Sequence, residues 1–238
     1  METETKTIET IFQPNLRLTQ KQMEAYLAIK KGQNVFLTGS AGTGKTSVIK
    51  AYVKEYCFRR KIAVTSTTGT SALLLGGTTL HSYLAIFFGK ESLNQLYNRI
   101  SNSHYHLCRW TKLDCLIIDE ISMLDPELFD KLEKLARLLR KNDKPFGGIQ
   151  LVLSGDFLQL PCVGTDNFCF EAKSWNSCVE KTFVFTEIIR QSDIEFQTCL
   201  NFLRFGIVNE TVINTLKDRK STRLNSSHTD ISRMPSSA

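Results

Sequence analysis

A glycine-rich loop is the clearest chemical feature of this 238-residue sequence. The run VFLTGSAGTGKT matches the pattern GxxxxGK[ST], in which backbone N–H groups surround phosphate oxygens. Lys45 is placed to reach the β- and γ-phosphates of a nucleotide, and the Thr46 hydroxyl is placed to ligate magnesium. The predicted ATP-binding residues of the loop are Gly39, Ser40, Ala41, Gly42, Thr43, Gly44, Lys45 and Thr46. The alternative, a glycine-rich turn without a ligand, does not account for the apolar run before the loop and the helical pattern after it.

Two adjacent carboxylates follow a second apolar run, in the sequence CLIIDE. A nucleotide-bound Mg²⁺ needs a carboxylate at the end of a neighbouring strand, and Asp119 meets this need, directly or through water. Glu120 is then placed to orient or deprotonate the attacking water as a general base. The alternative is that both are surface carboxylates at a strand end. With the loop upstream, the pair predicts an ATPase.

Short apolar runs alternate with longer amphipathic ones from Leu18 onward. This alternation predicts an α/β fold of the P-loop NTPase (RecA-like) type, a parallel sheet with helices on both faces. The predicted strands are residues 34–38, 62–65, 115–119 and 150–154. The predicted helices are residues 19–30, 45–58, 126–141 and 193–204.

The helix predicted at residues 126–141 has Asp125 as its N-cap and Pro126 at its first position. Its leucines share one side, which predicts core packing: Leu128, Leu132, Leu135 and Leu139. Opposite charges recur four residues apart, which predicts a solvated face: Glu127 with Lys131, Asp130 with Lys134, and Glu133 with Arg137.

Several ordered motifs resemble the first motor domain of the petite integration frequency (PIF) family of superfamily-one helicases. The blocks are LTQKQMEAYLAIKKGQNVFLTGSAGTGKT, TTGTSALLLGGTTLHSYL, DEISML, FGGIQLVLSGDFLQLP and FTEIIRQSDIEFQTCLNFLRFG, which together cover about residues 18–206. The resemblance implies an ATP-dependent helicase that moves 5'-to-3' on single-stranded DNA, unwinds duplex junctions and acts in DNA repair and recombination.

The resemblance also implies roles for three residues outside the loop. Gln22 is expected to hydrogen-bond the adenine edge, and Gln159 to sense the γ-phosphate and couple hydrolysis to DNA contacts. Arg190 matches the arginine finger of the family, which stabilises charge on the transferred phosphoryl group. For each of them the alternative is an ordinary structural or surface role.

Candidate DNA contacts lie in two of the same blocks. The residues offer hydroxyl, backbone and imidazole groups to phosphates: Thr68, Gly69, Thr79, His81 and Ser82. Tyr83 and Phe157 are candidates for stacking on bases, with core packing as the alternative for Tyr83. Two departures from the family pattern affect these segments, because Ser66-Thr67 replaces a usual Ala-Pro and Cys162 replaces a usual Pro.

Composition leaves most function classes open, with 42% hydrophobic and 23% charged residues. No run approaches the roughly 18 consecutive apolar residues of a membrane span, and the acidic start suits neither a signal nor a transit peptide. A net charge of +6 permits nucleic-acid binding without establishing it. Seven cysteines without a CxxC pair predict reduced thiols in an intracellular protein. His104, His106 and Cys108 have metal-ligand spacing but lack a second half, and we expect them between helical stretches.

The last 21 residues, 218–238, are polar and lack an apolar face, as in a disordered tail. Two stretches of a common sequencing-library adapter encode residues 218–228 and 232–238 codon by codon. We therefore expect a lead-in at 1–17, a motor domain at 18–217 and a non-native tail at 218–238. Residues 1–217 carry 26 Lys/Arg and 22 Asp/Glu, a net charge of +4.

Three functions compete at this point. The leading hypothesis is the N-terminal motor domain of a DNA helicase, which alone is expected to bind ATP but not to unwind DNA. The rivals are a stand-alone nucleotide-dependent switch or binding module, and the ATPase subunit of a recombination nuclease. The sequence leaves the oligomeric state open.

Overall fold

A computed structural model describes residues 18–189 and 194–218. Its centre is a six-stranded sheet with the strand order β3-β2-β4-β5-β1-β6, in which every paired strand is parallel. The strands are β1 (Val35–Gly39), β2 (Ile62–Ser66), β3 (Thr78–Thr79), β4 (Cys115–Asp119), β5 (Gln150–Gly155) and β6 (Lys181–Phe185). The predicted parallel α/β fold is confirmed.

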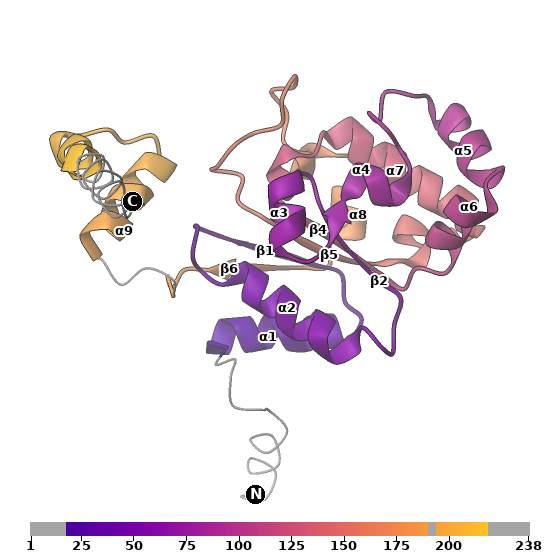
Figure 1. Ribbon diagram of the computed structural model, residues 1–238, viewed down its shortest axis with the longest axis horizontal. Helices are drawn as coiled ribbons and strands as arrows, with labels where there is room; N and C mark the ends of the chain where they lie inside the picture. The colour runs from indigo at the N-terminus through magenta and orange to yellow at the C-terminus, as the bar shows by residue number, and fades with distance from the viewer. Residues whose placement is uncertain (1–17, 190–193, 219–238) are drawn as a thin grey trace, which may run out of the picture. The chain divides into compact units, whose positions relative to one another are not determined.

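Helices connect the strands and cover both faces of the sheet (Figure 1). The helices are α1 (Gln20–Lys30), α2 (Lys45–Tyr56), α3 (Gly69–Leu74), α4 (Leu80–Leu84), α5 (Leu93–Ser101), α6 (His104–Thr111), α7 (Pro126–Arg140) and α8 (Trp175–Cys178). Short 3₁₀ turns follow at η1 (Ile121–Met123), η2 (Pro145–Gly148) and η3 (Cys169–Glu171). In the described residues, no helix has the length and apolar character that a membrane crossing requires.

Two hydrophobic clusters lie on opposite faces of the sheet. Alternate residues of β1 separate them, since Val35 and Leu37 face α1 and α2, whereas Phe36 faces α4 to α8. All five residues of β4 are buried, as expected for a central strand of a parallel sheet. Figure 1 shows α1 and α2 side by side beneath the sheet. The sheet therefore holds the loop after β1 and the carboxylates after β4 on one rigid core.

The predicted elements agree with the structure to within two residues at each described end. Asp125 caps α7 with Pro126 at its first position, and Leu128, Leu132, Leu135 and Leu139 are buried as predicted. Strand β6 was not predicted. It lies at the sheet edge, and only Phe183 and Phe185 of it are buried, so its apolar signal is weak.

The prediction of a solvated charged face on α7 is wrong in its detail. Glu133 is buried and pairs with Arg137. Asp130 instead accepts hydrogen bonds from the backbone N–H groups of Lys173 and Ser174, and Lys131 donates to backbone carbonyls at Gly89 and Glu91. These side chains fasten neighbouring loops to α7, which a helical spacing rule within one element cannot reveal.

The segment with His104 and Cys108 is helical as part of α6, not a connection between helices. The Cys108 Sγ and the His104 Nε2 lie 3.4 Å apart, one helical turn from each other. No group of three or more His, Cys, Asp or Glu side chains able to hold a metal occurs in residues 18–189 and 194–218. The spacing therefore reflects a helical pair.

A second compact unit follows Glu187. Within it, α9 (Ile194–Arg204) and a helix at residues 210–218 pack through Cys199 and Val212, which are both buried. Of the predicted helix 193–204, residue 193 lies outside the described residues, as do the predicted lead-in 1–17 and all of the predicted tail except Asp218.

Candidate nucleotide and metal site

The loop between β1 and α2 has the backbone that its glycines predict. Gly39 has φ +145°, and a Cβ atom there would lie 2.2 Å from the carbonyl oxygen of Phe185 on β6. Gly44, with φ +83°, occupies the N-cap position of α2 in the left-handed region. Only glycine fits the close approach at position 39, so the loop is held tightly against the sheet.

The start of α2 is open to a ligand. Gly44 provides no side-chain cap at the start of α2, an arrangement that favours an anion at this helix end. The Lys45 Nζ donates to the carbonyl oxygens of Gly39 and Ser40, at 2.6 and 3.1 Å. The Thr43 hydroxyl donates to the Ser40 carbonyl, and Thr46 is half-buried in the first turn of α2. The loop thus surrounds a position where helix N–H groups and one ammonium group meet.

Gln22 anchors this loop to α1. Its side chain is 1% exposed, its Nε2 donates to the Thr43 carbonyl at 2.9 Å, and its Oε1 accepts from the Thr19 N–H at 2.9 Å. Thr19 and Gln22 together form a capping box at the start of α1. The role of Gln22 toward adenine stays a prediction, and the structure adds a mechanical role in supporting the loop.

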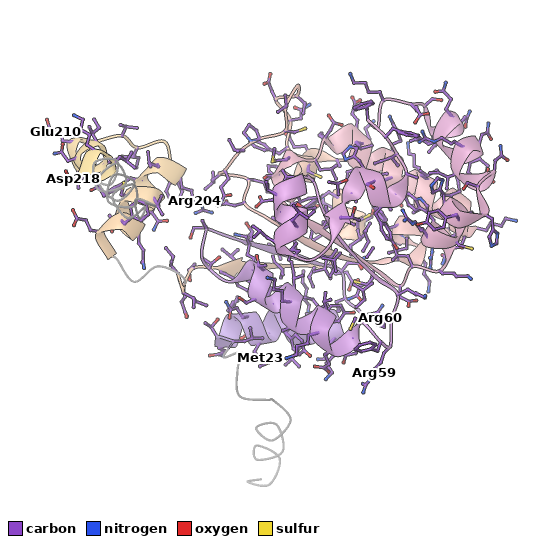
Figure 2. All side chains as sticks on the ribbon, in the orientation of Figure 1. Met23, Arg59, Arg60, Arg204, Glu210 and Asp218 are labelled. Atoms are coloured by element: carbon purple, nitrogen blue, oxygen red, sulfur yellow. The ribbon has the colours of Figure 1, made fainter. Side chains whose placement is uncertain are left out.

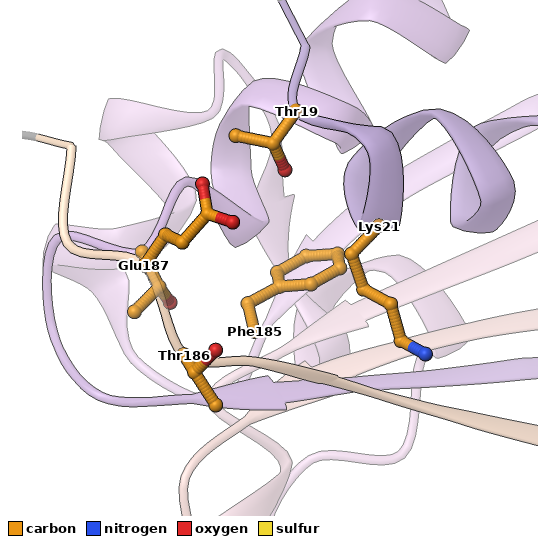
Figure 3. Close-up of a pocket in the computed structure, with 6 residues that line it drawn as sticks. Thr19, Lys21, Phe185, Thr186 and Glu187 are labelled. Atoms are coloured by element: carbon orange, nitrogen blue, oxygen red, sulfur yellow. The ribbon is translucent and has the colours of Figure 1, made fainter.

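A small pocket lies beside the loop (Figure 3). It is lined by Thr19, Lys21, Thr43, Phe185, Thr186 and Glu187. Figure 3 shows the Phe185 ring between the side chains of Lys21 and Glu187. The sequence analysis did not identify this pocket, because the strand that carries Phe185 was not predicted. Lys21, which lines the same pocket from α1, was missed with it. The aromatic residues of KTFVF are the signal that could have identified this strand.

The predicted carboxylate pair closes the other side of the site. Asp119 ends β4 with 6% of its surface exposed, and its Oδ2 accepts a hydrogen bond of 2.6 Å from the Ser71 hydroxyl. Glu120 has φ +55°, a left-handed backbone that is uncommon outside glycine. Burial and the nearby charges of Asp119 and Asp156 raise the pKa of Glu120, while Lys45 acts in the opposite direction.

These groups fit a divalent cation. Three carboxylates and one ammonium group lie within electrostatic range of each other around Glu120, and the resulting excess of negative charge favours a cation. The side chains of Thr46 and Asp119 carry hard oxygen atoms, and their role as metal ligands stays a prediction. Magnesium commonly takes one or two such protein ligands and completes its shell with water and phosphate oxygens.

Asp156, which directly follows β5, was missed by sequence reasoning. It is 1% exposed, and its carboxylate accepts from the Leu158 N–H at 3.2 Å and from the Gln159 Nε2 at 3.3 Å. An acidic residue directly after the apolar run QLVLSG is the signal that could have found it. Asp156 therefore orients the Gln159 side chain. The predicted arginine finger, Arg190, lies outside the described residues.

The candidate DNA contacts gather after β2 and β3, which are neighbours in the sheet. Thr68 caps α3 by accepting from the Ser71 N–H, and Thr79 caps α4 by accepting from the Ser82 N–H. Gly69 is the first residue of α3. The two hydroxyl groups thus have structural partners, and DNA binding by these residues stays a prediction.

The remaining DNA candidates are more enclosed. Burial lowers the pKa of His81, which favours a neutral imidazole. Tyr83 packs partly into the core beneath the guanidinium of Arg109, 5.2 Å from the ring centre. Phe157 belongs to an aromatic cluster with Phe36, Phe168, Phe170 and Trp175. Core packing is therefore shown for both aromatic rings, and their stacking on bases stays a prediction.

Comparison with known proteins extends this picture beyond the site. The chain is 40% identical over 214 residues to the ATP-dependent DNA helicase RRM3 of Saccharomyces cerevisiae, covering 86% of this chain and 30% of that protein. The Pif1 helicase of Candida albicans superposes with a TM-score of 0.81 at 38% identity, over 84% of this chain and 47% of that one.

A Bacteroides Pif1 helicase, solved in complex with ADP-AlF3 and ssDNA, has a TM-score of 0.75 at 31% identity. That alignment covers 94% of this chain and 52% of the Bacteroides chain. The present chain thus spans about a third to a half of these relatives. The sequence model of the PIF1-like helicases matches residues 17–209, and the chain belongs to the PIF1-like helicase family.

Proposed function

We propose that this chain forms the ATP-binding motor domain of a 5'-to-3' DNA helicase. One observation carries the proposal: the uncapped start of α2, the Lys45 ammonium group and the carboxylates of Asp119 and Glu120 lie close to one another. The whole helicase activity, in DNA repair and recombination, is inferred from relatives that are two to three times longer than the matched region.

Each side chain has a defined task at the nucleotide. Lys45 and the N–H groups of α2 bind the phosphates, while Thr46 and Asp119 hold Mg²⁺, which supplies charge neutralisation on the phosphate oxygens. Glu120 accepts a proton from the attacking water. Its raised pKa makes it a stronger base than an ordinary carboxylate. Gln159 contacts the γ-phosphate, and Arg190 supplies the arginine finger.

We infer that the base of ATP occupies the pocket beside the loop. Phe185 offers an aromatic face, and the polar groups of Thr19, Thr186 and Glu187 surround it. Gln22 lies behind Thr43 and contributes an amide at the adenine edge. Single-stranded DNA would lie along the ends of β2 and β3, at Thr68, Gly69, Thr79, His81 and Ser82, and would extend to Phe157 after β5. The inferred location is intracellular, and the oligomeric state is left open.

Nucleotide binding tests the proposal directly. We expect the 238-residue chain to bind a fluorescent ATP analogue, and Lys45→Ala to weaken binding about 10- to 100-fold, because two charge-assisted hydrogen bonds to phosphate are lost. Fluorescence anisotropy measures the affinity, and circular dichroism checks the fold. Equal affinities for the two proteins would contradict the site assignment.

Single-stranded DNA separates the helicase proposal from a nucleotide switch. A helicase motor domain should bind oligothymidylate with an affinity that differs between the nucleotide-bound and nucleotide-free chain. Binding of nucleotide with no detectable DNA affinity in either state would favour the switch.

A further inference from the structure

One residue joins the metal-binding carboxylate to the segment that precedes α3. The Ser71 hydroxyl donates to Asp119 Oδ2 at 2.6 Å, a short distance that is typical of a hydroxyl bound to a charged acceptor. Ser71 lies in the first turn of α3, whereas Asp119 is the last residue of β4, 48 positions along the chain. Because Ser71 holds Oδ2, the Asp119 carboxylate does not turn freely about its Cβ–Cγ bond.

The backbone N–H of the same serine has a second partner. It donates to the hydroxyl of Thr68, the N-cap of α3 and a candidate DNA contact. Thr68, Ser71 and Asp119 therefore form a continuous chain of hydrogen bonds. A shift of the Thr68 backbone against a DNA phosphate would reach the carboxylate through one intervening residue.

The residues just before Thr68 make further bonds to the carboxylate pair. Thr67 donates its N–H to the Asp119 carbonyl at 3.2 Å and its hydroxyl to the Glu120 carbonyl at 2.8 Å. Ser66 donates its hydroxyl to the Asp119 carbonyl at 3.2 Å. Since Glu120 has a left-handed backbone, the bond from Thr67 helps to hold this unfavourable conformation. The hydroxyls that replace a usual Ala-Pro thus strengthen the connection.

We propose that Ser71 is a positioning residue that sets Asp119 for magnesium and couples it to DNA bound at the start of α3. The inference rests on the proposed function, because it requires nucleotide with magnesium at the loop and DNA at Thr68 and Gly69. Ser71 touches neither nucleotide nor DNA in this scheme. It acts through Asp119 on one side and Thr68 on the other.

The experiment measures the magnesium dependence of nucleotide binding, which does not require hydrolysis. The 238-residue chain binds a fluorescent ATP analogue in EDTA and then in rising Mg²⁺, with and without oligothymidylate. Ser71→Ala removes the hydroxyl, Ser71→Thr retains it, and Thr70→Ala is the matched control at an exposed position of the same helix. Circular dichroism melts report folding for every protein.

We expect Ser71→Ala to raise the half-saturating Mg²⁺ concentration about tenfold, as for the loss of one hydrogen bond to a charged group, with unchanged affinity in EDTA. Oligothymidylate should shift the Mg²⁺ dependence of the unsubstituted chain and of Thr70→Ala, but not that of Ser71→Ala. Ser71→Thr should restore both properties. Thr67→Val, which removes only the bond to the Glu120 carbonyl, should reduce the DNA effect without abolishing it.

Specific results would overturn the inference. An unchanged Mg²⁺ dependence in folded Ser71→Ala contradicts the positioning role, and a DNA shift of normal size in that variant contradicts the coupling. If Ser71→Ala is unfolded, a normal DNA shift in folded Thr67→Val overturns the coupling instead. Failure of the unsubstituted chain to bind nucleotide would reject the proposed function, and the comparison with Lys45→Ala detects that failure separately.

Discussion

The two ends of β5 carry glutamines in opposite situations. Gln150 begins the strand and is 5% exposed; its Nε2 donates to the carbonyls of Ile29 and Gln33, and its Oε1 accepts from Arg60 at 2.6 Å. Gln159 lies four residues beyond the other end and is exposed, and its Nε2 donates a long bond of 3.3 Å to the Asp156 carboxylate. Figure 2 shows Arg60 near the C-terminal end of α2.

The amino end of β5 therefore contributes to stability, whereas its carboxyl end lies at the candidate site. At the amino ends of the strands, polar groups satisfy one another, since Arg60 also donates to Tyr52 and to the Asp114 carbonyl. At the carboxyl ends, carboxylates crowd together, Glu120 has a strained backbone, and the first N–H groups of α2 lack a side-chain cap. Unfavourable local arrangements persist where a ligand is to be bound.

The largest expected effect on stability is that of replacing Gln150. We expect Gln150→Leu, a change of similar volume, to lower the free energy of unfolding by about 2–4 kcal/mol, because two backbone carbonyls and a guanidinium each lose one hydrogen bond at a largely buried position. Urea denaturation measures the change. Gln159→Leu is the matched control, and we expect it to alter stability by less than about 0.5 kcal/mol because that side chain is exposed. Similar losses for the two variants would invalidate the contrast.

At Glu120 we expect a smaller change in the free energy of unfolding, and of opposite sign. Its pKa is raised in the folded chain by burial and neighbouring carboxylates, so the charged form opposes folding. Glu120→Gln should therefore stabilise the protein at pH 8, by about 2–4 °C in Tm for a gain of about 1 kcal/mol.

The pH dependence gives the sign of the Glu120 effect. The gain should decline as pH falls through the raised pKa and vanish below the ordinary value of 4.5, where the carboxyl group is protonated in both states. Thermal melts of both proteins from pH 4 to pH 8 measure it. A stabilisation independent of pH would show that charge is not its cause.

The same contrast explains which features could be predicted from the sequence. Gly39 and Lys45 could be placed because their chemistry depends on a local pattern within one loop. β4 could be placed because four consecutive apolar residues that end at an acidic residue admit few alternatives. The roles of Gln150, Ser71 and Asp130 could not, because each depends on partners that are distant in sequence and meet only in the folded chain. β6 was missed because an edge strand needs little apolar sequence.

The smallest expected effect concerns Gln159 and the γ-phosphate. If this exposed amide contacts that phosphate, Gln159→Leu should weaken binding of a non-hydrolysable ATP analogue about 2- to 10-fold, the cost of one hydrogen bond from a solvent-exposed amide, and leave ADP affinity unchanged. Anisotropy titrations with the two nucleotides measure the ratio. An equal loss for both nucleotides would place the side chain elsewhere in the site. No loss for either would make Gln159 a surface residue whose amide is held by Asp156 without reaching the nucleotide.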